Sequence, residues 1–152
     1  MLTPTFRRAE ARDLEAIIAL LADDDLGAGR EDPSHPPNPR YRTAFDAIEK
    51  DENQLLAVAE LDGRVVGTLQ LSFIPGLSRL GMTRGQIEAV RIAADARGGG
   101  LGEAMFEWAI EECRRRGCAL VQLTTDRARP DAHRFYERLG FVASHIGYKR
   151  AL

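Results

Sequence analysis

Three consecutive glycines stand directly before a long helical pattern, and this junction could bind an anion. Residues 97–102 read RGGGLG, and the amphipathic pattern that follows ends at Gly117. No Ser, Thr or Asp is present to cap the first turn, so the free N–H groups of the helix point into a space without side chains. Those donors and the positive end of the helix dipole suit a phosphate, and Arg97 adds a positive charge.

Two familiar phosphate-binding patterns do not match this run. The P-loop requires Lys followed by Ser or Thr, which is missing here, and G-x-G-x-x-G fails because Glu103 stands at its last position. A tight strand-to-helix turn alone would need one or two glycines. Because four of the five residues 98–102 are glycine, we favour a phosphate site of another kind.

The composition predicts one soluble globular domain over residues 1–152, with 44% hydrophobic and 29% charged residues. The 21 basic and 23 acidic residues give a formal charge of −2, which argues against nucleic acid or an anionic membrane as partner. No signal-like or membrane-spanning stretch is present, so a cytoplasmic protein is expected. The two cysteines, Cys113 and Cys118, are too few for a disulfide framework or a zinc site, and no metal is expected.

Hydrophobic periodicity predicts strands alternating with helices. Residues 54–73 read as a hairpin turning at Asp62-Gly63, and the prolines of 33–39 as an ordered loop or a mobile lid. A strand, a long helix and a second strand over 86–125 imply a parallel crossover, and therefore a mixed sheet. The other expected strands cover 5–9 and 141–150, and the expected helices cover 13–21, a short stretch around 45–48, 101–116 and 131–139.

The glycine run resembles the Arg/Gln-x-x-Gly-x-Gly/Ala motif of the GNAT superfamily of N-acetyltransferases, where it cradles the pyrophosphate of acetyl-coenzyme A. Residues 132–141, AHRFYERLGF, resemble that family's Ala-x-x-Phe-Tyr-Glu-x-x-Gly-Phe segment. With the strands at 87–93 and 121–126, the resemblance covers residues 54–152, and the first 50 residues correspond to the variable, acceptor-facing part. It implies an α/β fold with a mixed antiparallel/parallel, splayed central sheet of six to seven strands and about four helices.

The resemblance implies acetyl-coenzyme A as co-substrate. The glycine run would hold its pyrophosphate, the strand before it would lie along the pantetheine, and Arg129 stands where many members carry Asn. The implied cofactor-binding residues are Val90, Arg91, Ile92, Arg97, Gly98, Gly99, Gly100, Leu101, Gly102 and Arg129.

Acetyl transfer to an amine needs a base, because an amine with a pKa near ~10.4 is almost entirely protonated at pH 7. Glu88, in the central strand, is the candidate for this role. The alternatives are a surface carboxylate or an anion that binds the acceptor. Arg91 could keep Glu88 charged or could bind an acidic acceptor.

The reaction also needs donors for the carbonyl oxygen and for the departing sulfur. Backbone N–H groups of residues 90–92 could supply the first if the strand bulges there. Tyr136 would be protonated at pH 7 and is the candidate acid; the alternative is that Tyr136 and Phe135 are core aromatics. The isolated histidines are expected to have surface or structural roles: His35, His133 and His145.

The acceptor is an unidentified amine of a small molecule or peptide. Residues 33–41 and 74–85 are expected to form its walls, and their mixture of charges favours neither an acidic nor a basic substrate. A non-catalytic acyl-coenzyme A sensor is the alternative function. A Rossmann-type nucleotide domain is disfavoured by the hairpin before the glycines, and a homodimer is left open.

Overall fold

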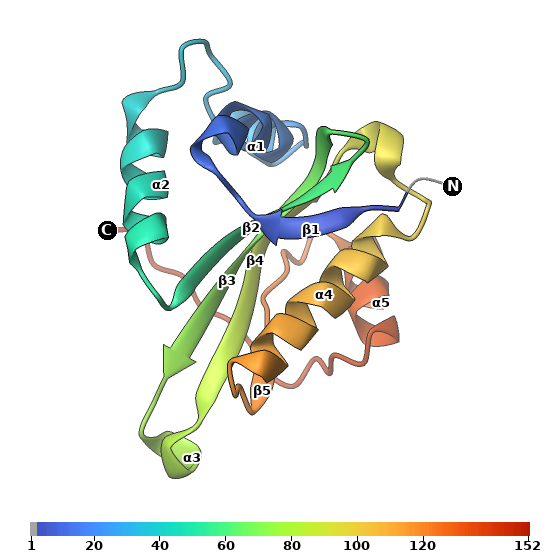
Figure 1. The fold of residues 1–152 in the computed structure, drawn as a ribbon. Helices are drawn as coiled ribbons and strands as arrows, with labels where there is room; N and C mark the ends of the chain where they lie inside the picture. The colour runs from blue at the N-terminus through green and yellow to red at the C-terminus, as the bar shows by residue number, and fades with distance from the viewer. Residues whose placement is uncertain (1–2) are drawn as a thin grey trace.

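The computed structural model describes residues 3–152, which form one five-stranded sheet covered by helices (Figure 1). The strand order is β1-β2-β3-β4-β5; the first four are antiparallel neighbours, and β5 runs parallel to β4. The strands are β1 (Thr5–Arg8), β2 (Gln54–Leu61), β3 (Arg64–Pro75), β4 (Thr83–Ile92) and β5 (Leu120–Gln122). The helices are α1 (Leu14–Ala22), α2 (Pro39–Lys50), α4 (Leu101–Arg115) and α5 (Pro130–Arg138), with a single turn at α3 (Ser78–Gly81).

The mixed sheet and its parallel crossover confirm the expected fold class. The β2–β3 hairpin turns at Asp62 and Gly63, whose φ values of 52° and 77° are those that a tight hairpin turn requires. Helix α4 connects β4 to β5, as the strand-helix-strand spacing predicts. The prolines of residues 33–38 lie in a loop, and α2 begins at Pro39.

The expected strand over 141–150 is wrong, and the sheet has five strands rather than six or seven. The apolar side chains of this segment are exposed, at 81% for Val142 and 91% for Tyr148. A strand exists only where a neighbouring edge accepts its hydrogen bonds, and β5, with three residues, offers a short edge. The local pattern was strand-like, but the described chain provides no ladder for it.

Helix α4 packs one apolar stripe against the sheet. Met105, Phe106 and Ala109 are almost fully buried in the main core, together with Leu69 and Leu71 of β3. Alternate residues of β3 therefore face α4. Burial of this size, about 1.5–3 kcal/mol for each large side chain, holds α4 against the sheet.

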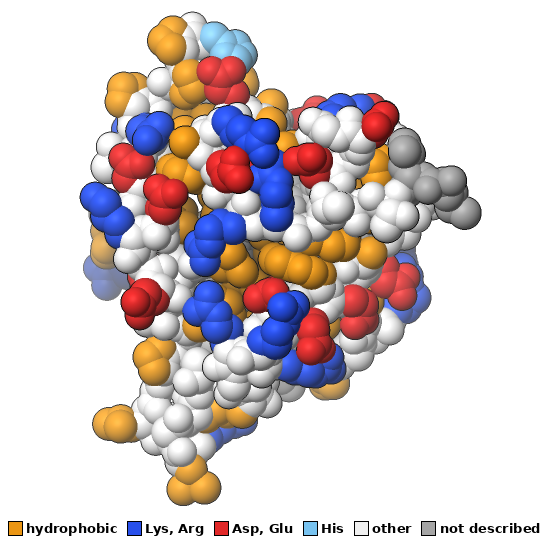
Figure 2. All heavy atoms as spheres, in the orientation of Figure 1, with side chains coloured by type: hydrophobic (Ala, Val, Ile, Leu, Met, Phe, Trp, Pro, Cys, Tyr) orange, Lys and Arg blue, Asp and Glu red, His pale blue; other side chains and the backbone are white. Residues whose placement is uncertain are grey.

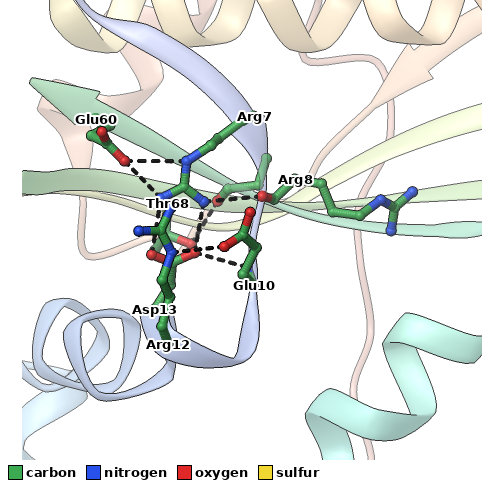
Figure 3. A network of polar contacts seen from close by, with 8 residues as sticks. Arg7, Arg8, Glu10, Arg12, Asp13, Glu60 and Thr68 are labelled. Atoms are coloured by element: carbon green, nitrogen blue, oxygen red, sulfur yellow. Dashed lines mark hydrogen bonds and ion pairs between the residues drawn. The ribbon is translucent and has the colours of Figure 1, made fainter. Parts of the chain in front are cut away.

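Helix α1 covers the other face of the sheet and is tied to it at its first turn (Figure 3). Arg7 in β1 donates to both carboxylate oxygens of Asp13, at 2.7 and 3.0 Å, and also binds Glu60 in β2. Asp13 further accepts the backbone N–H of Glu10, which closes the short turn before α1. This network fixes the start of α1 on the sheet. Because the helix is rigid, it also fixes the position of the residues that follow Ala22 at its C-terminal end.

The molecular surface is mixed in charge. Figure 2 shows Lys and Arg side chains interspersed with Asp and Glu on the face that it presents, with apolar surface between them. Apolar side chains also project from the β3–β4 hairpin tip, where Leu77 and Leu80 are fully exposed. Within residues 3–152 no helix is both long enough and apolar enough to span a bilayer.

Candidate active site

The parallel strands β4 and β5 separate soon after they meet. Their ladder pairs begin at Arg84 with Leu120 and end at Gln86 with Gln122. Within the described chain, the part of β4 beyond Gln86 has no strand on that side. This gap in the sheet lies between β4 and the segment that leads into α5 (Figure 1).

Strand β4 bulges inside this gap. Gln70 pairs with Glu88 and Thr68 pairs with Arg91, so β4 has two residues where β3 has one. One of the two, Ala89, has a φ of 55°, the positive value that a bulge of this kind requires. The expected bulge is therefore present. Gln70 and Thr68 are two positions apart on β3 and therefore lie on one face of the sheet. Their partners on β4, Glu88 and Arg91, lie on that same face.

The glycine run forms an open turn before α4. Gly98 and Gly100 have φ values of 84° and 83°, and Gly100 is the N-cap residue without any side-chain cap. A Cβ atom placed on Gly98, Gly99 or Gly100 would meet nothing within 4 Å. The first backbone bond inside the helix runs from the N–H of Ala104 to Gly100. The preceding N–H groups therefore face open space at the positive end of a 15-residue helix.

The flanks of the run hold this turn in place. Arg97 is exposed and its Nε donates to the carbonyl of Ile92 at 3.1 Å, which fixes the guanidinium beside the end of β4. Gly102 differs from the other glycines, because its Cβ would lie 3.7 Å from Phe135 and 3.9 Å from Ile92. Gly102 therefore lies where α4 meets α5 and β4, at ordinary contact distance, while Leu101 is buried beneath the turn.

Glu88 is exposed, on the face of the sheet that carries Gln70. The Oγ of Ser72 donates to its carboxylate at 3.4 Å, and the same hydroxyl lies 3.1 Å from Oε1 of Gln54. Within the described residues, no Lys, Arg or His forms an ion pair with Glu88. Arg91 forms its ion pair with a different carboxylate, that of Asp24.

Tyr136 combines an aromatic environment with two nearby cations. Its ring packs against Phe106, Phe135 and Phe141 at centroid distances of 5.4, 5.6 and 6.2 Å. Burial raises the pKa of Tyr136, while the positive charges of Arg129 and Arg91 act in the opposite direction. The phenol thus stays protonated at neutral pH and lies within the field of both arginines.

Asp24 joins the site and was missed by the sequence reasoning. Its Oδ2 lies 3.1 Å from Nε of Arg91 and 3.0 Å from Nη2 of Arg129, and its Oδ1 accepts the N–H of Gly27. Burial opposes charge on Asp24, but the bond from Gly27 and the two arginines outweigh burial and hold its pKa below the ordinary value. The one available signal was a run of three aspartates, 23–25, just after a predicted helix.

This cluster, Asp24 with Arg91 and Arg129, spans the gap in the sheet. Arg91 comes from β4, Arg129 directly precedes α5, and Asp24 follows α1. Arg91 and Arg129 were expected to touch the cofactor. Their side chains instead bind Asp24, the residue that follows α1. Val90 lies in the bulge and Ile92 follows it. This is the position from which their backbone N–H groups were expected to reach the carbonyl oxygen.

The two expected acceptor walls lie in different places. In the first, the hydroxyl of Tyr41 accepts the N–H of Asp32 and donates to Glu31, so the loop is held against α2. In the second, residues 76–82 form the distant tip of the β3–β4 hairpin (Figure 1), and only its end at Thr83–Gly85 approaches β5. No group of three or more His, Cys, Asp or Glu that could hold a metal ion is found among residues 3–152.

The model of the acetyltransferase (GNAT) family matches residues 14–141 of this chain. The chain belongs to that family, whose members are acetyl-coenzyme A-dependent acetyltransferases, and the resemblance drawn from the two sequence motifs is confirmed.

Individual relatives include two acetyltransferases and one protein described as a transcriptional regulator. The aminoalkylphosphonate N-acetyltransferase of Salmonella typhimurium is 35% identical over 112 residues, which are 74% of this chain and 72% of that enzyme. A crystal structure of a transcriptional regulator from Bacillus halodurans C-125 is 48% identical, with a TM-score of 0.96 over 99% of this chain and 100% of that one. An acetyltransferase of Trypanosoma brucei is 27% identical, with a TM-score of 0.79 over 99% and 100% of the two chains.

The glycine turn fits the co-substrate of this family. A pyrophosphate needs several convergent N–H donors and room for its oxygens, and the turn offers uncapped donors with no atom in the way of a Cβ at Gly98, Gly99 or Gly100. The gap beside the β4 bulge offers an unpaired strand edge for an extended chain such as pantetheine.

Proposed function

We propose that this chain transfers the acetyl group of acetyl-coenzyme A to the primary amine of a small molecule by direct attack. The observation that carries the proposal is the β4 bulge, which lies in the gap between β4 and β5 and leads directly to the uncapped glycine turn. In one step the amine nitrogen bonds to the carbonyl carbon and the carbon–sulfur bond breaks. One proton leaves the nitrogen and one reaches the sulfur.

The main chain would do most of the cofactor binding. We assign the pyrophosphate to the N–H groups of residues 98–102, with Arg97 beside them, and the pantetheine and carbonyl oxygen to the N–H groups of residues 90–92. Fixed backbone dipoles stabilise a developing negative charge without having to reorganise. Arg129 stands where many members of the family carry Asn, but its side chain binds Asp24, so we assign no pantetheine contact to it.

Glu88 would take the proton of the amine, directly or through a water molecule. Its carboxylate is exposed and carries no ion pair with a described residue, so its lone pairs are accessible to a substrate. Asp24, by contrast, is engaged by two arginines and is a poorer base.

Tyr136 would give its proton to the sulfur. Burial keeps the phenol protonated, and Arg91 and Arg129 favour the negative charge that forms on the oxygen after it donates. A sensor that only binds acyl-coenzyme A would need neither an accessible carboxylate nor a phenol beside cations. The small-molecule acceptor is supported by the Salmonella relative, whose name gives aminoalkylphosphonates as its substrates.

The test is Tyr136→Phe, which removes one hydroxyl and leaves the aromatic packing against Phe106 intact. We expect kcat to fall by about 100-fold while the KM for acetyl-coenzyme A changes little, because the hydroxyl acts in the transition state. The measurement is thiol release with a panel of amines.

Tyr148→Phe is the matched control, since Tyr148 is 91% exposed in the C-terminal segment. It should behave as the parent does. Near-normal kcat in Tyr136→Phe would show that another group protonates the sulfur. If none of the amines in the panel causes thiol release by the parent protein, the sensor function is favoured.

A further inference from the structure

The cluster of Asp24, Arg91 and Arg129 carries more positive than negative charge. Two guanidinium groups converge on one carboxylate oxygen, Asp24 Oδ2, at 3.1 and 3.0 Å. Arg30 and Glu31 lie near enough to act on Arg91 through space and offset each other. With Arg30 counted, three cations face two carboxylates, so the cluster retains one net positive charge.

The two arginines also have hydrogen-bond donors to spare. Each guanidinium carries five N–H groups. Nη1 of Arg91 donates to the carbonyl of Val90, and Nη2 of Arg129 donates to Asp24. Nε of Arg91 is buried and, although it is close to Asp24, it is not aligned for a hydrogen bond with any described residue. The donors that a ligand could use are therefore the spare N–H groups of Nη1 and Nη2 on the partly exposed guanidinium groups of the two arginines.

This cluster lies close to the carboxylate assigned as the base. The bulge puts Glu88 and Arg91 on one face of the sheet, opposite Gln70 and Thr68, which are two positions apart on β3. At about 3.3 Å per residue, the two positions are roughly 7 Å apart along the strand. A small molecule could therefore contact both, with its amine at Glu88 and another group at Arg91.

We propose that the acceptor carries an oxyanion, a carboxylate or a phosphonate, two to four bonds from its amine, and that Arg91 and Arg129 bind this oxyanion. The inference rests on the proposed function, since it names the acceptor of the same site. Planar guanidinium groups bind carboxylates and tetrahedral oxyanions through paired N–H groups. Asp24 then competes with the substrate for the same donors and keeps the arginines in position before binding.

The first experiment compares amines that differ in the second group. 2-Aminoethylphosphonate and 3-aminopropionate carry the oxyanion, and ethanolamine is the neutral control of similar length. We expect kcat/KM to be at least tenfold higher for one or both of the anionic amines than for ethanolamine. Equal values for all three would overturn the inference and leave the acetyltransferase function intact.

The second experiment uses two substitutions with opposite expected signs. Arg129→Met removes donors and should raise the KM for the preferred anionic amine about tenfold more than it raises the KM for ethanolamine. Because Arg129 also acts on Tyr136, kcat is expected to fall for every amine, so the readout is the difference between the two KM changes. Asp24→Asn removes the competing charge but keeps an oxygen for the N–H of Gly27, so it should lower that KM. Arg127→Met is the matched control, because Arg127 is exposed and two residues from Arg129. If the cluster is only structural, both substitutions in the cluster impair the enzyme in the same direction for every amine.

A direct binding measurement separates this inference from the proposed function. Calorimetry with 2-aminoethylphosphonate and with 3-aminopropionate, in the presence of coenzyme A, reports binding without turnover. Binding of either that is lost in Arg129→Met supports the oxyanion site even if no amine is acetylated. Absence of binding of both to the parent protein overturns it.

Discussion

The two ends of α1 are each tied to the sheet by an aspartate, but the two ties differ in charge. At the first end, Arg7 is shared by Asp13 and Glu60, so one cation serves two carboxylates. At the other end, Asp24 is shared by Arg91 and Arg129, so one carboxylate serves two cations.

The first tie is saturated and the second is not. All three nitrogens of Arg7 donate hydrogen bonds, and Asp13 is 5% exposed at its side chain. In the second tie Arg91 retains a buried nitrogen without a hydrogen bond among the described residues. At the first end of α1, every nitrogen of the arginine is therefore used in the network. At the other end, the arginines next to the bulge keep N–H donors that are not used within the described residues.

The largest effect is expected from Asp13→Asn. The substitution removes the charge that Arg7 binds through two hydrogen bonds, and hydrogen bonds to charged groups contribute about 1.5–3 kcal/mol each when buried. Because Arg7 keeps Glu60 and is partly exposed, we expect a loss of about 2 kcal/mol in the free energy of unfolding, measured by urea denaturation. Asp25→Asn, at an exposed aspartate, should change it by less than about 0.5 kcal/mol. Equal losses of unfolding free energy in the two variants would mean that the hydrogen bonds between Arg7 and Asp13 do not stabilise the fold.

The same pair predicts how stability depends on pH. The hydrogen bonds from Arg7 hold the pKa of Asp13 below its ordinary value, although burial opposes them. A lowered folded-state pKa gives stability that is fully present above the unfolded-state pKa, near ~3.9, and is lost as the pH falls through the folded-state value. The stability difference between the parent and Asp13→Asn should therefore be constant from pH 7 to about pH 5 and shrink at lower pH. A difference that grows with acid would contradict this assignment.

Much of this fold could be predicted from the sequence because the signals are local. Asp62-Gly63 predicted the hairpin, the glycines and the apolar stripe predicted α4, and the spacing predicted that β5 is parallel to β4. The segment 141–150 failed because strand formation depends on a partner edge, which no local pattern specifies.

The candidate site was predicted only in part, for a related reason. Glu88, Tyr136 and the glycine turn lie in recognisable motifs, and their roles stay predictions. Asp24 is 105 residues from Arg129, so its contact depends on how α1, β4 and α5 meet in three dimensions. An aspartate that follows a helix is common at protein surfaces. Only the three-dimensional structure shows that Asp24 contacts Arg91 and Arg129.

A smaller effect is expected from Glu88→Gln, which tests whether an unpaired carboxylate on this face acts as the base. Asp13 and Asp24 are neutralised by arginines, whereas Glu88 receives only a weak bond from Ser72. We expect turnover to fall about tenfold near pH 6 and by less near pH 9, because a free amine needs less help as the pH rises. The measurement is a pH–rate profile with a saturating amine. Parallel profiles for the two proteins would make Glu88 a binding or surface residue.

The smallest effect concerns the spare capacity of the second tie. If the cluster binds an oxyanion, saturating 2-aminoethylphosphonate or 3-aminopropionate should stabilise Asp24→Asn by about 1 kcal/mol, since a ligand present at several times its Kd stabilises the folded state by that order. Asp13→Asn should gain as much as the parent does and less than Asp24→Asn, because its cluster of Asp24, Arg91 and Arg129 is unchanged and Asp24 still competes with the ligand. Thermal unfolding with and without the two ligands measures both variants. A gain of equal size in Asp13→Asn and Asp24→Asn would show that Asp24 does not compete with the ligands for the two arginines, and the proposed role of this carboxylate would then be wrong.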